Sequence, residues 1–223
     1  MMLDGRSEPL HLFGPKELLP MLESFVDVRL EHLGFELIFE ALYGGWHKEF
    51  EHFTLKALPL IHSIECYAFY IETKPKRHID KAKLQAEGLP PGPLYADLKA
   101  GKCVIFEGKR FEPQHYVTQE PPQRIIIAGD NAEPAILGDY LYELDLLVHE
   151  ATYTQEVYDN LTKELLHTTA KNLAQTAARF NIKRLVATHL SPRFNDPSPI
   201  KQEIATYFQG EFWVAEDFMQ ISL

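Results

Sequence analysis

Apolar residues in the last hundred positions gather into continuous runs, separated by stretches in which they recur every three or four positions. Three of the runs, "RIIIAGD" (124–130), "LDLLVHE" (144–150) and "IKRLVATH" (182–189), predict buried strands. Further elements are predicted as helices over 133–143, 168–181 and 198–209, and as a last strand over 211–223. Continuous aliphatic strands that alternate with helices indicate an α/β fold, in which helices cover a sheet.

The first seventy residues have a different pattern. The stretch "GPKELLPMLESFVDVRLEHLG" predicts a helix over 14–34, with an apolar stripe formed by Leu18, Leu22, Phe25, Val26, Leu30 and Leu33. Three β-rich segments follow, at 35–42, 50–62 and 65–73. Their partly alternating content predicts strands with antiparallel neighbours.

Residues 73–122 interrupt this order with a long, less apolar stretch that is bracketed by strands. It holds clustered prolines, two short helical pieces and a hairpin that turns near Gly108. Such a stretch is typical of a protruding arm rather than of core. We therefore expect one domain over 1–223, with an arm inserted at 73–122.

Composition narrows the class of protein. The chain has 223 residues, 45% of them hydrophobic, and a net charge of −10, which excludes a uniformly basic nucleic-acid coat. No run of about 20 apolar residues exists, so no membrane span is predicted. The start "MMLDGRSEPL" lacks the pattern of a signal peptide, and two cysteines make no disulfide framework. A reducing cytoplasm is the predicted location.

Four apolar runs end on a group able to bind a metal or move a proton, namely His62, Asp130, Glu150 and His189. Ligands of such sheets bind beyond the carboxyl ends of the strands, so these side chains are expected to converge. Imidazole and carboxylate without thiolate suit a catalytic zinc or a similar divalent ion. A single histidine at a strand end is more often a polar loop cap, but four such residues together favour a site. His149 faces away from its neighbour Glu150 on a strand, which indicates a structural role.

The segment "LLHTTAKNLAQTAARF" adds a further group. Thr168 and Thr169 are candidates for the N-cap of the following helix, where free N–H groups favour a phosphate. His167, which precedes them, is placed to donate a proton to a leaving oxygen. An ordinary capped helix with a solvent-facing histidine is the alternative, and spacing alone favours it.

The predicted arm is basic at its start, in a chain that is acidic overall. The stretch "TKPKRHIDKAK" carries Lys74, Lys76, Arg77, Lys81 and Lys83 against Asp80. Such a patch suits a phosphate backbone. A solvated charged loop is the commoner alternative.

In these motifs the chain resembles the later two-thirds of ribonuclease Z, a tRNA 3′-processing endonuclease family of the metallo-β-lactamase superfamily. "PLIHSIECYAFYI" resembles the segment of the third histidine motif, "LPPGPLY" the Gly-Pro motif of the tRNA-clamping arm, and "AGDN" the Gly-Asp-Thr motif. "HEAT" is intact, "HTT" resembles the His-Ser-Thr motif, "ATHLSPRF" the segment of the last zinc ligand, and "AEDFMQI" the closing Ala-x-Asp motif.

The resemblance implies specific roles. It makes His62, Asp130 and His189 zinc ligands, with Asp130 bridging two zinc ions. His167 would stabilise the leaving group, and Glu150 would orient it. On the arm, the resemblance assigns tRNA binding to Pro91, Gly92 and Pro93. The implied fold is the αββα four-layer sandwich of the metallo-β-lactamase superfamily, with two sheets inside and helices outside.

The chain departs from the family in one respect. The HxHxDH motif, which supplies further zinc ligands and the expected base for the attacking water, is absent from the sequence. Three ligands cannot complete two zinc sites, so we expect weak zinc binding at most. We expect a truncated or mis-started ribonuclease Z, or one piece of a split one, with bare strand edges and exposed apolar faces.

The resemblance implies a cytoplasmic zinc endoribonuclease that cuts precursor tRNA on the 3′ side, as a homodimer in which the arm of one subunit holds tRNA for the other. Two alternatives remain open. A small-substrate hydrolase of the same superfamily would have no use for a basic arm. A non-catalytic binding module would keep the arm without metal, and zinc content would distinguish it from an enzyme.

Overall fold

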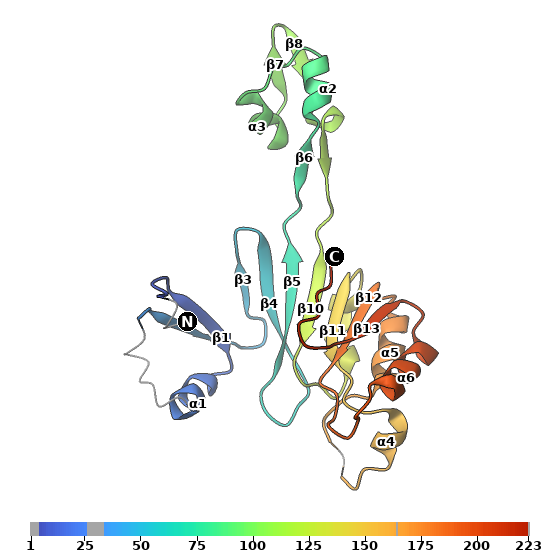
Figure 1. Ribbon diagram of the computed structural model, residues 1–223. Coiled ribbons are helices and arrows are strands. Elements are labelled where there is room, and N and C mark those ends of the chain that lie inside the picture. Colours follow the sequence, from blue (N-terminus) through green and yellow to red (C-terminus); the bar gives the residue numbers. More distant parts are fainter. Residues whose placement is uncertain (1–4, 26–33, 164, 223) are drawn as a thin grey trace. The chain divides into compact units, whose positions relative to one another are not determined.

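A computed structural model describes residues 5–25, 34–163 and 165–222 (Figure 1). The chain divides into two compact units, one formed by Met1–Ile71 with Arg124–Leu223, the other by Glu72–Gln123. Each unit has a hydrophobic core of its own. None of the described helices is both long and apolar enough to span a membrane.

The first unit is built on a seven-stranded sheet with the order β13-β12-β11-β10-β5-β4-β3. The strands are β3 (His47–Glu49), β4 (Phe53–Pro59), β5 (Tyr67–Thr73), β10 (Arg124–Ala128), β11 (Leu146–Glu150), β12 (Arg184–Thr188) and β13 (Glu211–Val214). Strands β10 to β13 run parallel, and β3 pairs antiparallel with β4. The three buried strands predicted from the aliphatic runs are therefore confirmed. The predicted last strand over 211–223 is shorter than expected. It ends at Val214, and residues 215–222 form turn or coil.

Helices cover one face of this sheet. They are the 3₁₀ element η3 (Pro134–Leu141) and the helices α4 (Gln155–Asp159), α5 (Ala170–Arg179) and α6 (Ser198–Tyr207). The register places Ile126, Leu147 and Leu185 side by side on adjacent strands, and none of the three is exposed. They share a core with Leu173 of α5 and Ile204 of α6. Shortening one of these buried side chains to alanine lowers the free energy of unfolding by about 2–5 kcal/mol. Packing on this face therefore holds the strands, and the residues at their ends, in place.

The opposite face of the sheet is also apolar. The pairings place Ile127, Val148, Val186 and Trp213 next to one another on it. Ile127 is 46% exposed. Besides this large sheet, the described residues contain three two-stranded sheets, one in the first unit and two in the second, so the second large sheet of the predicted four-layer sandwich is not among them.

The two-stranded sheet of the first unit pairs β1 (Leu10–Gly14) with β2 (Leu37–Ala41) in parallel. Helix α1 (Leu18–Phe25) follows β1, and the remaining predicted positions 26–33 lie outside the described residues. The antiparallel prediction is wrong for β2. Its partner is the strand on the far side of a helical crossover, and such a connection yields a parallel pair.

The second unit is small but has its own core. Its elements are β6 (Arg77–Ile79), α2 (Lys81–Ala86), α3 (Leu94–Lys99), β7 (Val104–Phe106), β8 (Lys109–Phe111), η2 (Pro113–His115) and β9 (Val117–Gln119). Leu84, Leu89, Leu98 and Phe111 are at most 1% exposed at its centre. The predicted hairpin turns at Gly108, whose φ of +78° suits a residue without a Cβ.

Candidate metal centre

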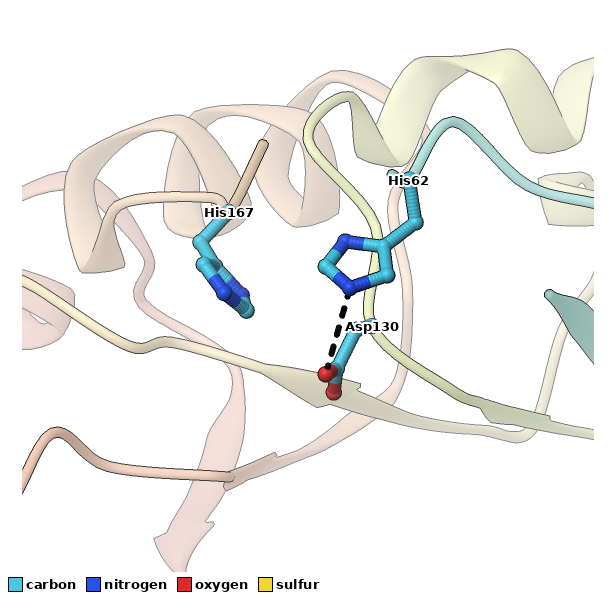
Figure 2. A group of neighbouring side chains, drawn as sticks. All are labelled: His62, Asp130 and His167. Atoms are coloured by element: carbon cyan, nitrogen blue, oxygen red, sulfur yellow. Dashed lines mark ion pairs between the residues drawn. The ribbon is translucent and has the colours of Figure 1, made fainter. Parts of the chain in front are cut away.

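The carboxyl ends of three parallel strands meet at the candidate site. Asp130 follows β10, Glu150 ends β11 and His189 follows β12, while His62 lies in the loop after β4. The Asp130 Oδ2 atom lies 3.7 Å from His62 Nε2 (Figure 2). The same atom lies 3.6 Å from His189 Nε2. The structure therefore brings the three predicted metal ligands together around one carboxylate oxygen.

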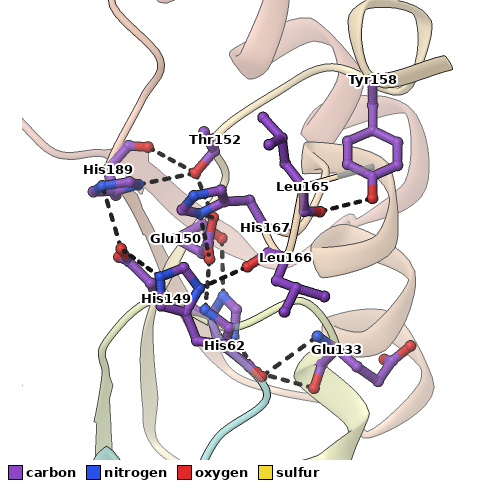
Figure 3. A network of polar contacts seen from close by, with 12 residues as sticks. His62, Glu133, His149, Glu150, Thr152, Tyr158, Leu165, Leu166, His167 and His189 are labelled. Carbon is purple, nitrogen blue, oxygen red and sulfur yellow. Dashed lines mark hydrogen bonds and ion pairs between the residues drawn. The ribbon is translucent and has the colours of Figure 1, made fainter. Parts of the chain in front are cut away.

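His167 and Glu150 form a pair beside these ligands (Figure 3). The Nδ1 atom of His167 is 3.1 Å from both carboxylate oxygens of Glu150, whose side chain is 1% exposed. The ring of His167 lies 5.0 Å from that of His62 and stacks at 5.2 Å on that of His189. Its position between the two rings excludes the alternative of a histidine that simply faces solvent.

His62, His167 and His189 are each held in place through the ring nitrogen Nδ1. Nδ1 of His62 is 2.9 Å from the Leu166 carbonyl, and Nδ1 of His167 faces the Glu150 carboxylate. Because both partners only accept, each Nδ1 must donate its proton to them, and each Nε2 is the ring nitrogen that these contacts leave available. A backbone carbonyl or carboxylate on the other nitrogen is the usual support of a metal-binding imidazole.

Thr152 extends this pattern to His189. Its hydroxyl donates to the Glu150 carboxylate and lies 3.0 Å from His189 Nδ1. A hydroxyl has one proton, and Thr152 uses it toward Glu150. The Thr152 oxygen therefore accepts a hydrogen bond from Nδ1 of His189, and this contact leaves Nε2 of His189 available. His189 also has a φ of 53°, a left-handed backbone that is uncommon outside glycine and is found at functional sites.

The donor set suits a zinc ion. Ligand atoms bound tetrahedrally at about 2.0–2.1 Å lie about 3.4 Å apart, close to the separations around Asp130 Oδ2. Among the described residues, two groups of donors have ligand atoms that all lie within 4.8 Å of one another. One group is His62, Asp130 and His167, and the other is Glu150, His167 and His189. The predicted ligands His62 and His189 therefore both approach Asp130 but do not belong to one close group. His167 belongs to both groups, so the geometry allows it to act as a ligand as well as an acid.

His149 is excluded as a ligand. Its side chain is fully buried, its Nδ1 donates to the Glu150 carbonyl, and its Nε2 is 2.9 Å from the Asn131 amide nitrogen. Burial lowers the pKa of His149 to about 4, so the ring is neutral at pH 7 and both nitrogens are used. The structural role predicted for His149 agrees with these contacts.

The start of α5 differs from the prediction of an open anion site. Thr169 is the N-cap and accepts from Asn172 N, as predicted for one of the two threonines. The N–H groups are not free, however, because Ala170 N donates to Tyr153 O and Lys171 N donates to the carboxylate of Glu203. An internal carboxylate therefore occupies the place predicted for a phosphate. The neighbouring Thr168 Oγ1 is buried without a hydrogen-bond partner among the described residues.

The predicted substrate-binding residues Lys74, Lys76 and Arg77 belong to the second unit, as do Pro91, Gly92 and Pro93. The exposed Arg77 guanidinium lies 3.3 Å from the Gln119 side chain and 3.3 Å from the Lys99 carbonyl, so it ties β6 to the end of α3. Pro93 caps the start of α3, and the Gly92 carbonyl accepts from Tyr95 N. Arg77, Gly92 and Pro93 therefore each make contacts that stabilise the second unit itself.

Sequence reasoning missed three residues that support the site. Asn131 and Thr152 lie within motifs that were recognised, and each directly follows or nearly follows a predicted site residue, which was an available signal. Glu203 gave no signal, because it lies on another helix, 32 positions from Lys171, and resembles an ordinary surface glutamate in the sequence.

Comparison with known proteins gives a consistent result. No protein-family model matches the chain. Curated relatives named ribonuclease Z include one from Pseudomonas putida, 34% identical over 99% of this chain and 72% of its own length. Another, from Marinobacter nauticus, is 31% identical over 96% of this chain and 70% of its own. A third, from Archaeoglobus fulgidus, is 28% identical over all of this chain and 73% of its own.

Solved structures with the same fold include the metallo-β-lactamase fold protein YhfI from Bacillus subtilis, with a TM-score of 0.57 and 15% identity, over 93% of this chain and 63% of that one. The short form of human tRNase Z has a TM-score of 0.56 and 22% identity, over 96% of this chain and 66% of that one. This chain thus spans less than two thirds of each of these two solved chains. These likenesses confirm a metallo-β-lactamase-type fold, and the sequence relatives show that the chain belongs to the ribonuclease Z family.

Proposed function

We propose that the chain provides the site of a zinc-dependent endoribonuclease that processes the 3′ end of precursor tRNA. The observation that carries this proposal is the placing of the His167–Glu150 pair directly beside the imidazoles that converge on Asp130, in a chain of the ribonuclease Z family. A proton-transfer pair beside a metal-binding carboxylate suits hydrolysis of a phosphodiester.

His62, Asp130 and His189 would hold the zinc. When bound, zinc supplies an activated water and compensates negative charge on the phosphate. The chain provides three such ligands, and catalytic zinc normally has three protein ligands per ion. We therefore propose a single, weakly bound zinc for these residues by themselves, since the sequence has no HxHxDH motif.

His167 would donate a proton to the 3′ oxygen that leaves. Its Nε2 is the nitrogen available for this step, because Nδ1 is held by Glu150. The buried carboxylate of Glu150 would stabilise the imidazolium form before transfer and keep the ring oriented. Thr152, which donates to Glu150, in turn fixes the carboxylate.

The second unit would act as the tRNA-binding arm, as part of a single domain over 1–223. It has nine Lys and Arg against seven Asp and Glu, whereas the whole chain has a net charge of −10. We propose that Lys74 and Lys76 contact the phosphate backbone of tRNA, with Arg77 beside them. A homodimer, which the family resemblance implies, and a cytoplasmic location, which the cysteine content suggests, remain predictions.

The roles of the two histidines can be separated in a chain extended by the N-terminal segment of the Pseudomonas putida relative. We expect His167→Ala to lower turnover of precursor tRNA by about 10²-fold or more while zinc content stays constant. His189→Ala should lower both turnover and zinc content. His52→Ala is the matched control, because that ring is 84% exposed and pairs only with Glu51 among the described residues.

Single-turnover cleavage and elemental analysis measure the two quantities. Loss of zinc with His167→Ala and its retention with His189→Ala would show that the two roles are exchanged. Hydrolysis of bis-p-nitrophenyl phosphate without any cleavage of precursor tRNA would favour a small-substrate hydrolase. Absence of zinc and of both activities would favour a binding module.

A further inference from the structure

Asn131, the residue after Asp130, uses every hydrogen-bonding position of its side chain. Its Oδ1 accepts from Ile61 N at 3.1 Å and from Glu133 N at 3.4 Å. Its Nδ2 donates to the Glu133 carbonyl and to His149 Nε2, both at 2.9 Å. The residue is 0% exposed, so no water competes for these bonds. An asparagine amide has two donor and two acceptor positions, and all four are filled.

The bonds of Asn131 join the three segments that carry the site. Ile61 precedes His62, Asn131 itself follows Asp130, and its backbone N–H donates to Glu150 Oε1 at 2.5 Å. These segments are otherwise separated by 70 positions between Ile61 and Asn131 and by 19 between Asn131 and Glu150. The side chain of Asn131 thus links the segment of Asp130 to the histidine loop, and its backbone N–H links that segment to the proton-transfer pair. The backbone bond from Ala132 N to Ile61 O adds to the first link.

His149 completes this arrangement by presenting a lone pair. Its Nδ1–H is committed to the Glu150 carbonyl, which leaves Nε2 as the acceptor that Nδ2 of Asn131 requires. The orientation of the amide is fixed independently, since the N–H of Ile61 needs an oxygen at Oδ1. The two residues therefore determine each other's orientation.

We propose that Asn131 and His149 act as a pair of positioning residues that hold His62, Asp130 and Glu150 in register for metal binding. This inference rests on the proposed function, because the residues that are held in register are the metal ligands and the proton-transfer group of that function. Neither residue touches the reacting atoms in this assignment. Supporting residues of this kind typically change metal affinity by about 10–100-fold when they are removed.

The first test needs no metal. Long-range ¹H–¹⁵N NMR of the chain should show His149 with its proton on Nδ1 and Nε2 as an acceptor. Asn131→Ala should alter the His149 Nε2 shift and speed amide exchange at Ile61 by at least about tenfold. Asn160→Ala is the matched control, since within the described part of the chain its amide donates only to the Glu156 carbonyl, on an exposed helix end.

The second test measures zinc binding by calorimetry. We expect Asn131→Ala and His149→Leu each to weaken binding by at least about tenfold, and the double variant to be little worse than either. His149→Gln, whose side-chain oxygen can accept in place of Nε2, should keep most of the wild-type affinity. A merely structural role would not give rescue by glutamine together with non-additive losses. Far-UV circular dichroism confirms folding, and the glutamine variant remains informative if Asn131→Ala does not fold.

Several results would overturn the proposal. A proton on Nε2 of His149 in the wild type would mean that this nitrogen cannot accept from Asn131, and the proposed pair would not exist. Unchanged exchange at Ile61 and an unchanged His149 shift in Asn131→Ala would show that the pair holds nothing in place, even if zinc binds. If the wild type bound no zinc while the NMR results held, the proposed function would fail and the positioning role toward His62 and Glu150 would stand.

Discussion

Three of the four histidines at this site have a ring nitrogen available and the fourth has none, and that difference distinguishes their roles. His62, His167 and His189 each donate from Nδ1 and keep Nε2 open toward the centre, whereas His149 has both nitrogens bonded. Residue type and position along a strand do not distinguish these cases. The distinction comes from acceptors supplied by other segments, among them a carbonyl more than a hundred positions away from His62.

At the residue scale, His149 should make the stability of the fold depend on pH. Burial lowers its pKa to about 4 in the folded state, against about 6.5 when unfolded. The unfolded chain therefore binds more protons between these values, so this contribution is complete above pH 6.5 and is lost as pH falls toward 4. The size is about 3 kcal/mol in the free energy of unfolding.

Urea unfolding of the wild type and of His149→Gln from pH 7 to pH 4 measures this contribution. Glutamine does not titrate, so the variant should lose about 3 kcal/mol less than the wild type over that range. Equal losses in the two proteins would mean that other groups control the acid sensitivity. His52→Ala, an exposed histidine, should behave as the wild type.

At the element scale, Glu203 of α6 joins the starts of two other helices. Its carboxylate accepts from Gln155 N at the start of α4, at 3.0 and 3.1 Å, and from Lys171 N at the start of α5, at 3.0 Å. Both N–H groups lie at positive ends of helix dipoles, where a carboxylate is favourable. The loop between these helices carries His167, so Glu203 stabilises the segment that positions the proposed acid.

Glu203→Ala should therefore lower the free energy of unfolding by about 1–3 kcal/mol, because it leaves two N–H groups without their acceptor. Glu203→Gln should lose less, since one side-chain oxygen remains. Thermal unfolding measures both, and Glu156→Ala, an exposed acidic residue in the first turn of α4, is the control. A loss no larger than that of the control would show that water replaces the carboxylate.

Prediction from sequence succeeded for strands that are marked by continuous aliphatic runs. Strands β10, β11 and β12 are continuous aliphatic runs, and the parallel register then brings Asp130, Glu150 and His189 together. It failed for the pairing of β2, since alternation describes which face is buried and not which strand lies alongside. It also failed for the anion site at α5, because the occupying carboxylate of Glu203 comes from a distant helix.

At the scale of the whole molecule, the two units differ in charge. The Glu72–Gln123 unit has two more basic than acidic residues, and the rest of the chain is strongly acidic. Several of its cations are already paired, as Lys109 is with Glu87 and Lys102 with Asp97. Arg77 bonds within the unit, so its removal would mix a loss of charge with a loss of structure. Lys74 and Lys76 are exposed side chains in the basic stretch at the start of the unit.

Changing Lys74 and Lys76 together to glutamine should weaken tRNA binding and flatten its dependence on salt. Each phosphate contact contributes about 0.7–0.9 to the slope of log K against log salt, so two contacts should reduce that slope by about 1–2. Hydrolysis of bis-p-nitrophenyl phosphate by the extended chain should stay constant, because so small a substrate needs no arm. Changing Lys109, already paired with Glu87, is the matched control within the same unit and should alter the slope less. If both substrates were affected equally, the lysines would act on the fold of the chain, and the proposed role of the second unit in gripping tRNA would be wrong.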